Sequence, residues 1–62
     1  MSRLLIYTKD VQRITGKGKT AAQNLITAIK RQLKIERYST LTIREFCDYM
    51  RLDVEAVQAQ LN

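Results

Sequence analysis

Residues 15–20 are TGKGKT, and the fold of the chain depends on what this stretch forms. Gly-Lys-Thr is also how a nucleotide-binding phosphate loop ends, but that loop has the form Gly-x-x-x-x-Gly-Lys-Ser/Thr and follows a buried strand. Counting back from Gly18, the first glycine of the motif falls on Arg13, and a chain of 62 residues is too short for the parallel sheet that holds such a loop. The stretch therefore predicts a bend between two helices.

A short helix is predicted before the bend. The Thr8 hydroxyl can accept a hydrogen bond from a first-turn N–H group, so we expect Thr8 to be the N-cap, and Asp10 suits the positive end of the helix dipole. Val11 and Ile14 give this helix one apolar face. Gly16 tolerates the positive φ with which many helices end.

A second, longer helix is predicted from Lys19 to about Leu33, after a start near Gly18. Its apolar residues recur at the spacing of one helix face. They are Ala22, Leu25, Ile26, Ile29 and Leu33. The other side of the helix carries polar and basic residues: Thr20, Gln23, Asn24, Thr27, Arg31 and Lys34.

Two more helices are predicted in the second half of the chain. Thr42 and Glu45 have the spacing of a capping box, in which each side chain accepts a hydrogen bond from the other residue's backbone N–H. The helix that follows has an apolar stripe made of Ile43, Phe46, Cys47 and Met50. Asp53 is expected to cap a last helix, Val54 to Leu61. We expect Tyr7, Tyr38 and Tyr49 to close the edges of the core.

These elements predict an all-α fold in a single domain, residues 1–62. The fold is a compact four-helix domain made of two helix-turn-helix-like pairs. Residues 8–35 form the first pair, and residues 41–62 form a supporting pair. No Asn-Gly or Asp-Gly hairpin signal is present, so no β-wing is expected.

The charge of the chain is concentrated in its first part. Residues 1–37 carry nine Lys or Arg against two acidic residues, whereas residues 38–62 carry two against four, which gives the net charge of +5. A sequence pI near 9.8 with the cations in one half is typical of proteins that bind polyanions. A basic surface that only maintains solubility is the alternative.

Composition excludes several classes of site. With no histidine and one cysteine, the chain cannot form a zinc finger, a His-based catalytic dyad or an internal disulfide. Cys47 is expected in the core, and Asp53 and Glu55 are explained as the cap and first turn of the last helix, so no metal, cofactor, small-molecule substrate or enzymatic activity is predicted. The longest apolar run, Leu4 to Tyr7, is too short to span a membrane. A soluble, cytoplasmic protein is therefore expected.

The stretch YTKDVQRITGKGKTAAQNLITAIKRQL, residues 7–33, resembles a known group of DNA-binding proteins. It is similar to the small helix-turn-helix proteins of bacterial mobile elements and phages, which include excisionase-like proteins and transcriptional regulators. The matching positions are Thr8, Val11, Ile14, Gly16, Lys17, Ala22, Leu25 and Ile26. Gly18 and Ala21 depart from the pattern, which has Ser and Thr there. The resemblance implies a helix-turn-helix fold and binding to double-stranded DNA.

In a helix-turn-helix, the second helix enters the DNA major groove and its side chains contact base edges. Amide and hydroxyl side chains suit such contacts, so base contacts are predicted for Thr20, Gln23, Asn24 and Thr27. Phosphate contacts are predicted for Lys17, Lys19, Arg31, Lys34, Lys9 and Arg13, and Arg3 is expected to act as a mobile arm. One unit this small makes few base contacts, so a homodimer or a cooperative oligomer on DNA is expected.

Two readings of the sequence remain in competition. The first is a DNA-binding protein with sequence preference that acts in transcription regulation or as a recombination accessory factor. The second is a small protein–protein interaction module, an adaptor or inhibitor, that does not bind DNA. The second would display an exposed apolar patch on the third or fourth helix.

Overall fold

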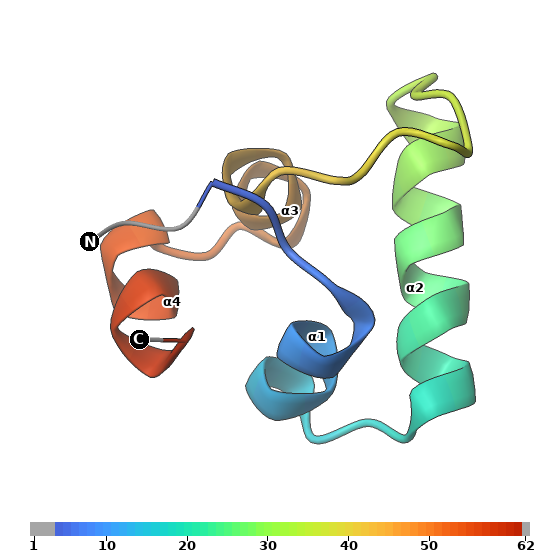
Figure 1. Ribbon diagram of the computed structural model, residues 1–62. Helices are drawn as coiled ribbons and strands as arrows, with labels where there is room; N and C mark the ends of the chain where they lie inside the picture. Colours follow the sequence, from blue (N-terminus) through green and yellow to red (C-terminus); the bar gives the residue numbers. More distant parts are fainter. Residues whose placement is uncertain (1–3, 62) are drawn as a thin grey trace.

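The computed structural model describes residues 4–61 and contains four helices in this range, with no strand or sheet among the described residues (Figure 1). The helices are α1 (Thr8–Thr15), α2 (Lys19–Gln32), α3 (Ile43–Met50) and α4 (Val54–Leu61). The predicted all-α, four-helix fold is confirmed. None of the helices in the described range is both long and apolar enough to cross a membrane.

The bend between α1 and α2 forms at the two glycines. Gly16 adopts the left-handed conformation, with φ of 73°, and its N–H donates to the carbonyl of Gln12 at 2.8 Å. Gly18 is the extended N-cap of α2, and its carbonyl accepts from the N–H of Ala22 at 2.9 Å. At the other end of α1, the N-cap is Tyr7, whose N–H donates to Asp10 at 2.8 Å. The cap predicted at Thr8 was therefore wrong by one residue.

The end of α2 differs from the prediction. Lys34 takes a left-handed conformation with φ of 56°, and the N–H of Ile35 donates to the carbonyl of Lys30 at 2.8 Å. This turn reverses the chain, so that Ile35 packs against the core while Leu33 is 43% exposed. The prediction that Leu33 belongs to the buried apolar stripe of α2 was therefore wrong. The spacing of apolar residues does not show at which residue the backbone stops being helical.

The caps of α3 and α4 form as the sequence predicts. The N–H of Glu45 donates to the Thr42 hydroxyl at 3.0 Å, and the N–H of Thr42 donates to the Glu45 carboxylate at 3.0 Å. Asp53 accepts from the N–H of Ala56 at 3.2 Å. Each of these bonds satisfies a backbone donor that the first turn of a helix leaves without a partner.

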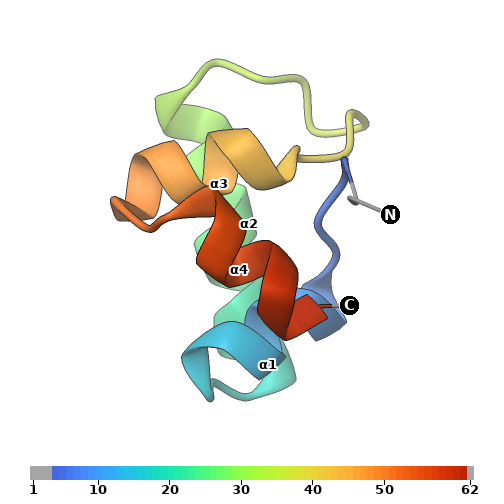
Figure 2. The same cartoon turned by 90° about the vertical axis from the view of Figure 1, so that its left-hand side faces the viewer.

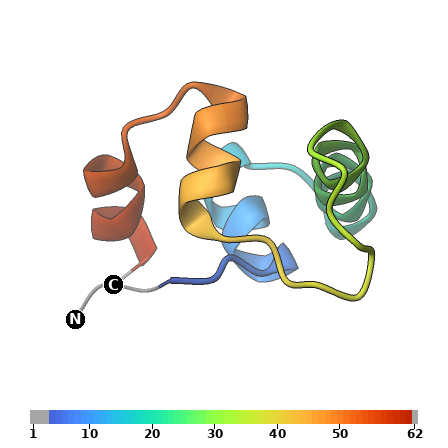
Figure 3. The same cartoon turned by 90° about the horizontal axis from the view of Figure 1, so that it is seen from above.

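One apolar core joins all four helices and the segment before α1. Its fully or nearly fully buried members are Ile6, Val11, Ala22, Ile29, Leu41, Ile43, Phe46, Cys47, Val57 and Leu61. Helix α1 packs against α2 and α4, and α3 packs against α4. As a result α2 and α4 lie on opposite sides of the molecule with α1 and α3 between them (Figures 1 and 3).

The segment before α1 runs beside the chain that leads into α3. The N–H of Ile6 donates to the carbonyl of Leu41, and the N–H of Ile43 donates to the carbonyl of Leu4, both at 2.9 Å. This single antiparallel bridge between Leu5 and Thr42 ties the first and second halves of the chain together (Figure 2).

The three tyrosines do not close the core edges as expected. Tyr38 is 88% exposed, Tyr7 is 52% exposed and Tyr49 is 40% exposed. Tyr38 stands on the long connection between α2 and α3, whose exposed residues leave the ring no core to pack on.

Candidate nucleic-acid interface

The outward side of α2 carries the residues predicted to contact bases. Ala22 and Ile29 turn inward and are completely buried, which fixes the rotation of the helix about its axis. Thr20, Asn24 and Thr27 consequently lie on the outer surface, where successive spacings of four and three residues place them on one face. Gln23 lies beside this face and is also exposed. The structure thus brings all four predicted residues together on one accessible helix.

The four polar side chains differ in what they can offer a partner. The Thr27 hydroxyl donates to the carbonyl of Gln23 at 3.0 Å, so its proton is committed to the helix and it presents only acceptor lone pairs and a methyl group. Within residues 4–61, the side chains of Thr20, Gln23 and Asn24 make no hydrogen bond. These three can both donate to and accept from an incoming ligand.

The N-terminal end of α2 is positively charged and held in place. Lys17 and Lys19 are exposed on either side of Gly18. The Thr15 hydroxyl donates to the carbonyl of Val11 at 2.7 Å and accepts from the N–H of Lys17 at 3.3 Å, which fixes the turn against α1. Because Gly18 has no side chain, the first-turn N–H groups of α2 have no side-chain cap and remain available to an anion.

No acidic residue occurs between Asp10 and Glu36, so α2 carries no negative charge. The predicted phosphate contacts Lys17, Lys19, Arg31 and Lys34 are exposed, and no ion pair engages them within the described part of the chain. The other two, Lys9 and Arg13, lie one helical turn apart on α1 and are exposed as well. Arg3 lies outside the described residues.

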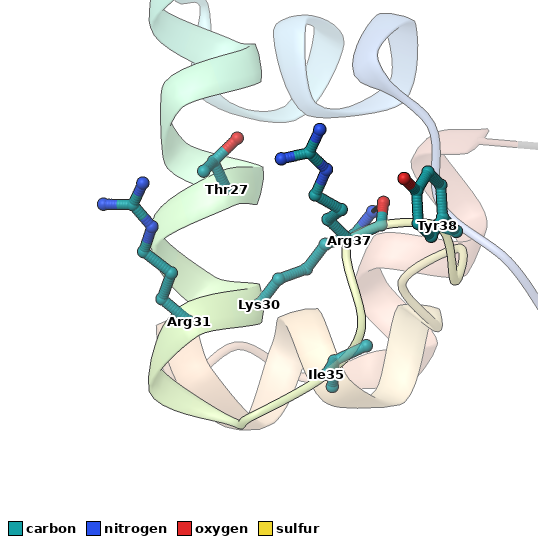
Figure 4. A pocket seen from close by; sticks show the side chains of 6 residues that line it. All are labelled: Thr27, Lys30, Arg31, Ile35, Arg37 and Tyr38. Atoms are coloured by element: carbon teal, nitrogen blue, oxygen red, sulfur yellow. Dashed lines mark hydrogen bonds between the residues drawn. The ribbon is translucent and has the colours of Figure 1, made fainter.

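A hollow of about 590 Å³ lies at the C-terminal half of α2, against the connection to α3 (Figure 4). It is lined by Thr27, Lys30, Arg31, Ile35, Arg37 and Tyr38. The Lys30 ammonium donates to the carbonyl of Arg37 at 3.3 Å, and the Arg37 guanidinium carbon lies 5.7 Å from the centre of the Tyr38 ring.

The sequence favours phosphate contact by Arg37 and base stacking by Tyr38 less than the contacts predicted on α2, so neither residue is among the predicted contact residues. The only signal for them was a break in the apolar pattern after Leu33 that still contains basic residues and one aromatic residue. A pattern of this kind does not indicate which way the chain turns after α2, so it could not place these side chains beside Thr27.

The other chemistry-bearing side chains form no comparable site. Cys47 is completely buried, as predicted; burial raises the pKa of its thiol, and the negative charges of Asp48 and Asp53 raise it further. A thiol in this environment is a poor nucleophile because the thiolate is disfavoured. Among the described residues, no group of three or more Cys, Asp or Glu side chains is arranged to hold a metal ion.

Comparisons with protein-family models, with curated proteins and with solved structures find no match.

Proposed function

We propose that this protein binds double-stranded DNA with sequence preference, using α1 and α2 as a helix-turn-helix. The supporting observation is the outward face of α2, where the side chains of Thr20, Gln23 and Asn24 make no hydrogen bond within residues 4–61. The lysines and arginines that border them form no ion pair within the same residues. A helix is narrow enough to enter the major groove, and this combination of side chains suits base edges and phosphates respectively.

In the proposed complex, Thr20, Gln23 and Asn24 contact base edges. Gln and Asn side chains can form two hydrogen bonds with adenine, so the preferred site should contain A·T pairs opposite them. Thr27 contributes its methyl group, which suits apolar contact with thymine. Lys17, Lys19 and the free N–H groups of the first turn hold phosphates at the entrance to the groove.

We further propose that the protein acts in the bacterial cytoplasm as a small transcriptional regulator or recombination accessory factor. One copy offers few base contacts, and half-sites bound by two copies would raise both affinity and specificity. A homodimer or a cooperative oligomer on DNA is therefore the expected assembly. The proposal involves no cofactor and no catalysis.

The proposal is tested by selecting bound sequences from a random duplex pool and then titrating the selected duplex in gel-shift experiments at several salt concentrations. Affinity should fall steeply as salt rises, because binding releases counterions from the DNA. Lys17→Ala and Lys19→Ala should each reduce the slope of log K against log salt by about 1 without changing the preferred sequence. Gln23→Ala should instead relax the preference at one position, at a cost of about 1–3 kcal/mol.

Arg51→Gly is the control for the loss of one positive charge. Arg51 follows α3 and has a left-handed φ of 58°, which glycine adopts more easily than arginine, so the variant should fold and bind normally. If micromolar protein shifts no duplex at low salt, the proposed function is wrong.

A second candidate, a protein–protein interaction module, is favoured by two exposed apolar side chains at the end of α3. Tyr49 is 40% and Leu52 39% exposed. This candidate requires that a host protein be captured equally well with and without nuclease treatment, and that Tyr49→Ser or Leu52→Ser abolish the capture. Capture that disappears with nuclease would support DNA binding instead.

A further inference from the structure

The connection between α2 and α3 presents an unusual combination of exposed side chains. Tyr38 exposes 88% of its surface, and Arg37 lies against its ring. Both side chains line the hollow that Thr27 and Arg31 border from α2 (Figure 4). An aromatic ring displayed beside guanidinium groups is a common arrangement on surfaces that contact nucleic acids.

The backbone of this connection is fixed rather than merely long. Lys34 reverses the chain, and the N–H of Ser39 donates to the carbonyl of Glu36 at 3.0 Å in a tight turn. The Lys30 ammonium donates to the carbonyl of Arg37 and so ties the turn to α2. The backbone at Arg37 and Tyr38 is therefore held beside the helix, and little backbone ordering would be needed when a ligand binds.

The hollow lies on the flank of α2 that also carries Gln23. Thr27 and Lys30 follow Gln23 by four and seven residues, which places all three along one side of the helix. In contrast, the opposite flank carries Ala21, Ala28 and Gln32, none of which is charged. The charged groups beyond the base-contacting residues are therefore concentrated on one side of α2.

The length of α2 determines what this flank would meet. Its 14 residues extend about 21 Å. The major groove is about 12 Å wide, so a helix whose N-terminal turns contact base edges reaches past the wall of the groove with its C-terminal turns. The sugar–phosphate strand that borders the groove lies in that position.

We propose that the 33–40 connection is a second DNA-contacting element that holds the sugar–phosphate strand bordering the groove occupied by α2. Arg37 and Arg31 contact a phosphate of that strand, and the Tyr38 ring packs against an adjacent sugar. Guanidinium groups suit this role because their planar donors match two phosphate oxygens. Glu36, the acidic residue of the connection, does not line the hollow. The inference depends on the proposed DNA binding by α2.

The experiment uses the full chain and the selected duplex, with Arg37→Ala, Tyr38→Ala and Tyr38→Phe compared with Lys17→Ala and with Arg51→Gly. Arg37→Ala should weaken binding about tenfold and reduce the salt slope by about 1. Tyr38→Ala should weaken binding roughly fivefold at an unchanged slope, and Tyr38→Phe should bind as the parent protein does, because the ring makes the contact. Thermal unfolding verifies that these surface variants remain folded.

Phosphate-ethylation interference then locates the contact. The parent protein should show two separate groups of sensitive phosphates, of which Arg37→Ala loses one and Lys17→Ala the other. Normal affinity and an intact interference pattern for Arg37→Ala and Tyr38→Ala, with Lys17→Ala impaired, would overturn this inference and leave the proposed function standing. An effect of Tyr38→Ala on single-stranded DNA alone would also overturn it. Failure of the parent protein to bind any duplex would refute the proposed function itself.

Discussion

Two glycines only two residues apart have different roles in the turn between α1 and α2. Gly16 has a φ of 73°, a conformation that is costly for other residues, whereas Gly18 has a φ of −71° that any residue can adopt. A Cβ atom added at either position meets no atom within 4 Å. The backbone alone therefore distinguishes them.

This difference leads to a prediction for Gly18→Ser. The serine hydroxyl can accept from a first-turn N–H of α2 that now has no side-chain cap, and the substitution also lowers the entropy of the unfolded chain. The free energy of unfolding should rise by about 0.5–1 kcal/mol, measured as a higher urea midpoint at an unchanged m-value. Gly16→Ser is the matched control and should lower it by about 1 kcal/mol. Equal effects of both substitutions would contradict this account.

For single residues, the sequence correctly predicts structural roles that depend on partners a few positions away in the chain. The capping pair Thr42 and Glu45, the cap Asp53 and the glycine that ends α1 are all found as expected, because each depends on a few neighbouring residues. Tyr38 was misplaced because its burial depends on the path of a connection that has no periodic pattern.

Among the elements, α3 begins with a full capping box. Besides the two backbone bonds of the capping box, the Thr42 hydroxyl donates to the Glu45 carboxylate at 2.9 Å. Helix α3 supplies Ile43, Phe46 and Cys47 to the core, so its first turn positions a large part of the buried surface.

Thr42→Ala removes the side chain that accepts from the Glu45 N–H and leaves Glu45 without its hydroxyl partner. The free energy of unfolding should fall by about 1 kcal/mol, as is typical for an N-cap threonine. Thr40→Ala is the control, since Thr40 is exposed and makes no hydrogen bond within the described residues. Chemical denaturation of the two variants in parallel measures the difference; similar losses would mean that the cap contributes nothing beyond the side chain's own burial.

The buried and exposed faces of α2 could be predicted from the sequence over the residues that are helical, Lys19–Gln32. The stripe of Ala22, Leu25, Ile26 and Ile29 turns inward, so the outward position of Thr20, Gln23, Asn24 and Thr27 follows from the sequence alone. The hollow did not follow, because it depends on the left-handed Lys34 and on the bond from Lys30 to the carbonyl of Arg37. In the sequence, Lys30 and Lys34 look like any other surface lysines, so neither the turn nor the hydrogen bond could be predicted.

For the whole molecule, the segment before α1 does more than its length suggests. Ile6 is almost completely buried, its own N–H donates to the carbonyl of Leu41, and the carbonyl of Leu4 accepts from the N–H of Ile43. These contacts join residues more than thirty positions apart, and no local pattern in the sequence indicates them.

Ile6→Ala should therefore destabilise the entire domain rather than only its first residues. Truncating a buried isoleucine costs about 2–5 kcal/mol, which is a large share of the stability of so small a protein. Leu4→Ala is the control, because Leu4 is 74% exposed and its substitution should change stability by less than about 0.5 kcal/mol. Thermal unfolding followed by circular dichroism should show a lower Tm for Ile6→Ala alone; loss of only the segment, with the helices unfolding at the original Tm, would contradict the prediction.

The burial of Cys47 makes the protein well suited to site-directed spectroscopy. It is the only cysteine of the chain, and its thiolate is disfavoured, so a maleimide dye should leave it untouched while the fold is intact. A cysteine introduced at the exposed Ala59 of α4 would then carry the fluorophore at the end of the molecule opposite α2. Energy transfer from that position to dyes on either end of a duplex would report which way round the domain sits on its site.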